Sequence, residues 1–199
     1  MQISWLGDAG IRLHVKDTVV IIDPPTTRPI RQAAHIVAIT QKDGREWKSI
    51  PGNPFLIDVP GEFERAGVFV YGLGLATEPQ RLHFRIEAED MSLGHLGNLD
   101  HRLENGELSS LEGVDVLFVP VGGKGVLTPD QATELISQIE PRIIIPIQYQ
   151  ATGLKSPYGP LEPFLKAMGA KSTEAIDKFK IDKRSLPADE TQVVILNVS

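Results

Sequence analysis

The chain has 199 residues, a formal net charge of −6 and no cysteine, and 41% of its residues are hydrophobic. This length and composition predict one cytoplasmic domain spanning residues 1–199, since no signal peptide opens the chain and no apolar run reaches the roughly 20 residues of a membrane span. The acidic balance argues against a nucleic-acid surface, and the lack of thiols excludes disulfides, thiolate metal ligands and a cysteine nucleophile.

Apolar segments separated by polar turns predict a run of strands in the first half of the chain. Residues 2–6, 10–15 and 18–23 are rich in Ile, Val and Leu. Their short connections predict an antiparallel meander that ends at Asp23. The same pattern predicts five more strands, over residues 35–40, 54–58, 67–73, 81–87 and 91–95.

The second half of the chain is typical of strands that alternate with helices. The nearly continuous apolar run at residues 115–121 predicts a strand covered on both faces. Thr128 and Gln131 then form the capping-box pattern that begins a helix, and another strand is expected at residues 142–146. A strand–helix–strand order usually joins parallel strands, so the sequence predicts a layered α/β domain. Two further elements are predicted, a helix over residues 160–168 and a strand over residues 191–198.

Seven segments of the chain together carry a family resemblance. They are Ile3-Ser-Trp-Leu-Gly7 with the meander to Pro24, Val37-Ala-Ile-Thr40, Val59-Pro-Gly-Glu-Phe-Glu64, His95-Leu-Gly-Asn-Leu99, residues 115–123, Thr128-Pro-Asp-Gln-Ala132 and Ile145-Pro-Ile-Gln-Tyr149. Their order resembles that of the compact branch of the metallo-β-lactamase superfamily, over nearly the whole length of the chain. The resemblance implies a four-layer αββα sandwich whose pocket lies where the loops after residues 40, 97 and 147 converge.

The metal loop of catalytic members of this family follows the fourth strand and reads His-x-His-x-Asp-His, and it binds one or two zinc-type ions. In this chain the resemblance places Gln41, Asp43, Arg45 and Glu46 at those positions. Three further family ligands, a bridging aspartate and two histidines, correspond to Asn98, Gln148 and Asp8. Amide oxygens bind zinc weakly, and an arginine repels a nearby dication.

We therefore expect no metal or other cofactor, and we predict a non-catalytic relative that binds an unidentified small ligand or protein partner in the ancestral pocket. In this hypothesis Arg45 or Lys42 neutralises the acids that remain there. No residue is assigned a catalytic role. The pocket candidates are Asp8, Asp23, Gln41, Asp43, Arg45, Glu46, His95, Asn98, Gln148 and Tyr149.

Two other functions are compatible with the same sequence. A hydrolase of a small ester or phosphoester would use a reduced site in which Asp43, Glu46, His95 and His101 hold one divalent metal ion. Against this, His95 is expected to hydrogen-bond to the backbone at a strand end, with His101 exposed on a loop. The third hypothesis is a structural or assembly subunit, which a large exposed apolar patch would favour.

Three smaller features of the sequence also need an interpretation. The Gly-Gly-Lys-Gly segment at residues 122–125 predicts a tight strand-to-helix turn, although such a loop can also cradle a phosphate. Glu62 and Glu64 are expected in a turn, with an acid pair beside the pocket as the alternative. The remaining histidines, on predicted strands, are expected to be packing or surface residues: His14, His35 and His83.

Overall fold

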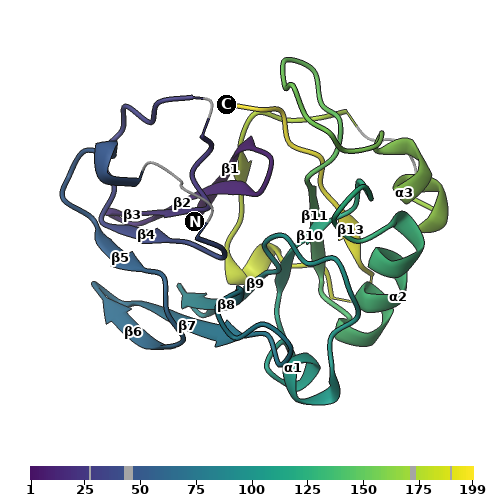
Figure 1. The fold of residues 1–199 in the computed structure, drawn as a ribbon, viewed down its shortest axis with the longest axis horizontal. Coiled ribbons are helices and arrows are strands. Elements are labelled where there is room, and N and C mark those ends of the chain that lie inside the picture. The colour runs from purple at the N-terminus through teal and green to yellow at the C-terminus, as the bar shows by residue number, and fades with distance from the viewer. Residues whose placement is uncertain (27, 43–46, 171–173, 189) are drawn as a thin grey trace.

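The computed structural model describes every residue of the chain except 27, 43–46, 171–173 and 189. The described residues form two β-sheets that enclose a common core, with helices on the outer side of the larger sheet (Figure 1). The smaller sheet has the strand order β12-β1-β2-β3-β4-β5, with bounds Phe179–Lys180, Gln2–Gly7, Gly10–Val15, Thr18–Ile22, Ile36–Ala38 and Phe55–Ile57. The larger sheet has the order β13-β11-β10-β9-β8-β7-β6, with bounds Gln192–Val193, Ile143–Ile147, Val116–Pro120, Met91–His95, Leu82–Ala88, Val68–Gly74 and Gly61–Arg65.

Helices connect and cover these strands. The α-helices are α1 (Asn105–Ser109), α2 (Pro129–Ile139) and α3 (Glu162–Ala167), and the two 3-10 helices are η1 (Trp47–Ser49) and η2 (Lys183–Ser185). The predicted meander is confirmed, because β1, β2 and β3 pair antiparallel. The predicted crossover is confirmed as well, because α2 joins β10 to β11 and these two strands run parallel.

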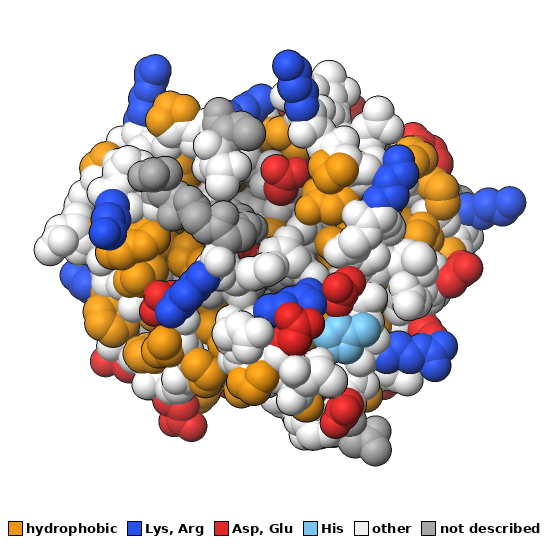
Figure 2. Space-filling view, viewed as in Figure 1, with side chains coloured by type: hydrophobic (Ala, Val, Ile, Leu, Met, Phe, Trp, Pro, Cys, Tyr) orange, Lys and Arg blue, Asp and Glu red, His pale blue; other side chains and the backbone are white. Residues whose placement is uncertain are grey.

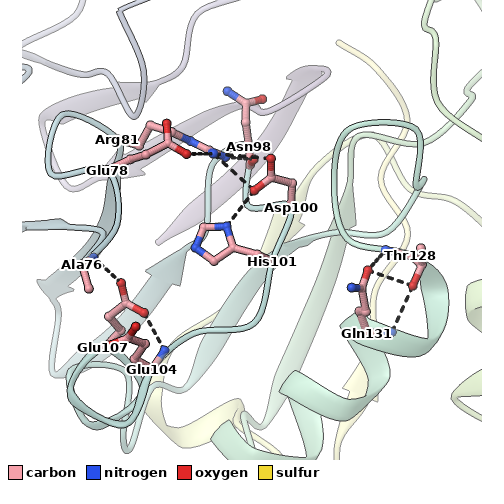
Figure 3. Close-up of polar contacts among 10 residues, drawn as sticks. All are labelled: Ala76, Glu78, Arg81, Asn98, Asp100, His101, Glu104, Glu107, Thr128 and Gln131. Carbon is pink, nitrogen blue, oxygen red and sulfur yellow. Dashed lines mark hydrogen bonds and ion pairs between the residues drawn. The ribbon is translucent and has the colours of Figure 1, made fainter.

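The main core lies between the sheets and continues under α2. Strand residues that point inward, such as Trp5, Phe84 and Phe118, are fully buried in one apolar cluster. Helix α2 begins at a Thr128 cap whose side chain accepts from the Gln131 backbone N–H, and the Gln131 side chain accepts from the Thr128 backbone N–H (Figure 3). The helix then buries a stripe of four apolar residues at helical spacing, as predicted: Ala132, Leu135, Ile136 and Ile139.

A second, smaller core covers the outer face of the six-stranded sheet. Val19, Ile21 and Val37 point outward from β3 and β4, and they pack with Ile50 and the half-buried Trp47 of the segment that contains η1. Within the described residues, the layer outside this sheet therefore consists of η1 and extended chain, whereas α2 and α3 form the layer outside the other sheet (Figure 1). The four-layer αββα sandwich is present, with one outer layer reduced.

Strand β6 corrects the expectation for Glu62 and Glu64. Both residues lie on this edge strand rather than in a turn, and both are exposed. The segment was missed because its side chains are mostly polar: only Phe63 turns toward the core, and pairing with β7 is made by the backbone. The short helix α1 was also not predicted.

The open edges of the two sheets lie near each other at β5 and β6. The rings of Phe55 and Phe63 are 5.9 Å apart, and Phe55, Val59 and Phe69 are more than two-fifths exposed. Figure 2 shows hydrophobic side chains gathered over this part of the molecule, at the lower left. Among the described helices, none has the length and apolar character of a membrane-spanning helix.

His83 is a buried histidine of β8 that links this sheet to the end of α1. Ser110 donates its hydroxyl hydrogen to the Glu107 carbonyl, so His83 Nε2, 3.1 Å from Ser110 Oγ, is the donor in that contact. Its Nδ1 atom is buried and has no hydrogen-bond partner among the described residues. Burial lowers the pKa of His83 to about 4, against a small opposing effect of Glu107.

We expect His83 to make the protein acid-sensitive. The unfolded chain has a histidine pKa near 6.5, so the stability contributed by neutral His83 is complete above about pH 6.5 and is lost as the pH falls toward 4, by roughly 3 kcal/mol. Urea unfolding between pH 7 and 4 should show this loss. The His83→Gln variant should be less stable than the wild type at pH 7, but its free energy of unfolding should fall less between pH 7 and pH 4. An unchanged pH dependence would contradict the assignment.

Candidate functional site

A cavity of about 340 Å³ opens where the loops of the predicted pocket meet. Four pocket candidates line it from four separate loops: Asp8, Gln41, Asn98 and Gln148. Seven other residues complete its wall: Pro25, Thr26, Lys124, Gly125, Val126, Pro157 and Tyr158. The convergence expected from the family resemblance is therefore present for the described residues.

Three amide side chains are joined across this cavity by hydrogen bonds. Gln148 Nε2 donates to Asn98 Oδ1, and Asn98 Nδ2 donates to Gln41 Oε1 over 3.3 Å. Gln148 Nε2 also lies 3.0 Å from the Tyr158 hydroxyl. The Gln148 side chain is almost completely buried, and its Oε1 atom has no hydrogen-bond partner within the described part of the chain. A buried acceptor in this state costs about 1–3 kcal/mol until a donor reaches it.

Three of the non-glycine lining residues have a strained backbone. Asp8, Lys124 and Gln148 have φ angles of 48°, 54° and 52°, in the left-handed region that non-glycine residues rarely adopt. Asp8 and Gln148 are linked, because the Asp8 carbonyl accepts hydrogen bonds from Gln148 N at 3.2 Å and from Trp5 Nε1 at 2.9 Å. Such conformations cost on the order of 1 kcal/mol each and concentrate at functional sites.

Asp23 lies behind the cavity rather than in its wall. Its carboxylate is fully buried and accepts from Thr40 N at 2.9 Å and from Thr40 Oγ1 at 2.5 Å. Gly97 packs directly on Thr40: a Cβ atom at Gly97 would lie 2.6 Å from two Thr40 side-chain atoms. Asp23 therefore fixes the loops that carry Gln41 and Asn98.

His95 is hydrogen-bonded to the backbone through both ring nitrogens, in agreement with the simpler of its two interpretations. Nε2 lies 2.9 Å from the Ala9 carbonyl, and Nδ1 accepts from Gly97 N at 3.1 Å. The ring is fully buried against Phe118. These bonds leave no ring nitrogen directed toward the cavity.

His101 belongs to a partly exposed charge cluster beside Asn98 (Figure 3). Its Nδ1 lies 2.7 Å from Asp100 Oδ1, and Arg81 Nη1 reaches the same carboxylate at 3.2 Å. Partial burial acts to raise the pKa of Asp100, but the hydrogen bond to His101 and the charge of Arg81 outweigh it and hold that pKa below its usual value. Arg81 Nη2 also donates to the Asn98 carbonyl at 2.5 Å, so this arginine positions the loop that carries Asn98.

Tyr149, a pocket candidate from the sequence, is placed in the core. Its ring stacks on Trp5 with centroids 4.8 Å apart, and burial raises its pKa well above the usual range. Tyr158 lines the cavity instead. No periodic or motif signal marks Tyr158 in the sequence, since it lies in the irregular segment between β11 and α3.

Comparison with known proteins identifies the family. Residues 2–148 match the family described as the beta-lactamase superfamily domain. The chain belongs to this superfamily. The crystal structure of a proposed Zn-dependent hydrolase of the metallo-β-lactamase superfamily from Thermotoga maritima is 28% identical, with a TM-score of 0.85 over 98% of this chain and 97% of that one.

Two further proteins are more distant or shorter matches. Igni18, a metallo hydrolase from Ignicoccus hospitalis, shares the fold with a TM-score of 0.67 at 15% identity, over 91% of this chain and 99% of that one. A protein of Enterococcus faecalis (strain ATCC 700802 / V583), named UPF0173 metal-dependent hydrolase, is 33% identical over 64 residues. That match spans 32% of this chain and 29% of the relative.

The described side chains that line the cavity include three amides and no histidine. Among the described residues, no three His, Asp or Glu side chains lie where they could jointly hold a metal ion. Gln41, Asn98 and Gln148 present amide groups, which are weak zinc ligands. Asp43, Arg45 and Glu46 lie outside the described residues. Lys42, proposed as a neutralising cation, pairs with Asp58 at 3.1 Å.

We predict that the Asp23–Thr40 contact sets the stability of this site. Thr40→Val keeps the side-chain shape but removes a hydrogen bond to a buried carboxylate, so it should lower the free energy of unfolding by about 1.5–3 kcal/mol. The matched control is Thr133→Val on α2, whose hydroxyl bonds only to a carbonyl of its own helix and whose loss should cost less than about 1 kcal/mol. If both variants lose the same free energy of unfolding in chemical denaturation, the hydrogen bond from Thr40 to Asp23 contributes little to stability.

Proposed function

We propose that this protein is a non-catalytic member of the superfamily that binds a small polar ligand in the amide-lined cavity without a metal ion. The observation that supports this is the hydrogen-bonded chain Gln148–Asn98–Gln41 at the positions where the family resemblance expects metal ligands. Neutral amides that bond to one another need no central cation, whereas clustered carboxylates need one to offset their charge.

The direction of the amide chain suggests the class of ligand. Each amide donates to the next, which leaves the Gln148 carbonyl oxygen as an acceptor at one end and the Gln41 amide N–H group as a donor at the other. Neither of these two groups has a partner within the described residues. A ligand with one donor and one acceptor, such as a primary amide or a lactam, matches both ends. Lys124 and the Tyr158 hydroxyl add a charge and a second polar contact to the wall.

Metal content and hydrolysis test the absence of catalysis. Protein purified without chelator should contain far less than one equivalent of Zn, Mn or Fe by elemental analysis. It should hydrolyse neither p-nitrophenyl acetate nor bis(p-nitrophenyl) phosphate faster than a blank with the same added Zn²⁺ or Mn²⁺. Stoichiometric metal, or turnover that depends on added metal, would overturn the proposal.

Restoring metal-type donors tests whether the cavity is the old metal site. The triple variant Gln41→His, Asn98→Asp and Gln148→His should bind Zn²⁺ at least 100-fold more tightly than the wild type in a competition assay, because imidazole and carboxylate replace amides. Histidine is tolerated at the left-handed position of Gln148. A matched control makes the same changes at exposed sites: Gln80→His, Asn53→Asp and Gln192→His. Equal zinc affinity in both triple variants would refute the placement of the site.

A second candidate function is metal-dependent hydrolysis, which the names of the Thermotoga and Enterococcus relatives favour. It would use the reduced set Asp43, Glu46, His95 and His101, and His95 would have to exchange a backbone hydrogen bond for the metal. The same elemental analysis distinguishes the two candidates, since this one requires one bound metal ion per chain.

A further inference from the structure

Three arginines line a second cavity on the outer side of the six-stranded sheet. Its volume is about 290 Å³, and Arg12, Arg28 and Arg31 all contribute to its wall. The remaining lining residues are Leu6, Pro25, Pro29, Ile30, Gln32 and Ser199. No aspartate or glutamate side chain is among them, although the protein as a whole carries a net charge of −6.

Among the three arginines of this cavity, Arg12 is the one that lies on a strand of the sheet. It lies on β2 directly opposite Ile21 of β3, and residues directly opposite on neighbouring strands share a face of the sheet. Ile21 packs in the small outer core, so Arg12 also points to the outer face, where it is half-buried beside Leu6. A long cationic side chain is thus placed among apolar groups.

Among the described residues, no carboxylate forms an ion pair with the arginines of this cavity. No carboxylate among the described residues, that of Ser199 included, lies within 4.0 Å of a nitrogen of Arg12, Arg28 or Arg31. The Arg12 Nε atom is buried and lacks a hydrogen-bond acceptor within the described residues. Arg28 uses Nη2 to donate to the Gly153 carbonyl at 3.1 Å, which leaves its other donors available.

The surroundings of Arg12 disfavour positive charge on this arginine and on a nearby histidine. Burial lowers the pKa of the Arg12 guanidinium. The pKa of nearby His14 is lowered first by burial and then by the positive charges of Arg12 and Lys178, against the effect of its hydrogen bond with Gln32. A half-buried guanidinium without an anion is costly, and an oxyanion that accepts from it would remove that cost.

We infer that this cavity is a binding site for the phosphate group of a small anion. Three guanidinium groups offer paired N–H donors that fit phosphate oxygens, and their combined charge favours a dianion over a monocarboxylate. The volume is sufficient for a phosphate group with a few attached atoms. The site is separate from the amide-lined cavity and shares only Pro25 with it, so it does not depend on the proposed function.

Calorimetric titration with three anions tests the site on the full chain. Inorganic phosphate and glycerol 3-phosphate should each bind with saturable heat, whereas acetate at the same concentration should not. Tighter binding of glycerol 3-phosphate would identify a phosphate ester as the natural class, and tighter binding of phosphate would identify the free ion. Failure of both phosphates to bind, or binding of acetate as tightly as phosphate, would overturn the inference.

Variants assign any binding to the three arginines. Arg12→Gln and Arg31→Gln should each weaken phosphate binding about tenfold or more, since each removes a charge-assisted hydrogen bond. The matched control is Arg65→Gln on the exposed edge strand β6, which should change the dissociation constant by less than about twofold. Arg31 is exposed, so its replacement carries little risk of unfolding, and circular dichroism checks the fold of the Arg12 variant. Undiminished binding in both test variants would refute the site.

Discussion

The hydrogen bonds between the buried residues Asp23 and Thr40 hold together the loops around the amide-lined cavity. Asp23 follows β3 and donates its backbone N–H to the Ala38 carbonyl at the end of β4, while its carboxylate binds Thr40 through two hydrogen bonds. The Thr40 carbonyl in turn accepts from Leu82 N of the other sheet at 2.7 Å. One carboxylate therefore fixes two strand ends of the first sheet and their attachment to the second.

The spacing of the amide groups depends on this arrangement. Gln41 comes directly after Thr40, and Asn98 follows Gly97, which packs against the Thr40 side chain at a distance that excludes any larger residue. Arg81 supports the same loop from the other side through the Asn98 carbonyl. A preorganised scaffold of this kind allows neutral amides to be held in a fixed geometry, which a ligand site requires whether or not a metal takes part.

Much of the scaffold was predictable from the sequence because its signals are local. Apolar runs and the Thr128–Gln131 capping box depend on near neighbours, and α2 and most of the predicted strands lie within a few residues of their observed bounds. The strand predicted over residues 191–198 was too long, because β13 spans only Gln192–Val193. The convergence of Gln41, Asn98 and Gln148 was predictable only through the family resemblance. Strand β6 was missed because its polar side chains conceal a strand that is held by backbone pairing.

The residues that sequence reasoning missed lie in segments whose local pattern does not distinguish them. Arg81 and Tyr158 reach the site from segments without a distinctive pattern, and nothing in the alternation of β2 distinguishes Arg12 from an ordinary exposed cation. Conversely, Tyr149 stands next to Gln148, but its ring stacks on Trp5 in the core while Gln148 lines the cavity. Adjacency in the chain was a poor guide to which side chain faces the cavity.

The acidic edge strand β6 has a consequence for how copies of this protein meet. If the β6 strands of two molecules aligned antiparallel about Phe63, Glu62 of each would face Glu64 of the other, and the like charges would repel. Phe55 and Phe69 are exposed close by, and without these charges they would favour association of two molecules at this edge. Alternating glutamates thus act as a safeguard against edge-to-edge polymerisation, at no cost to the packing of the sheet they border.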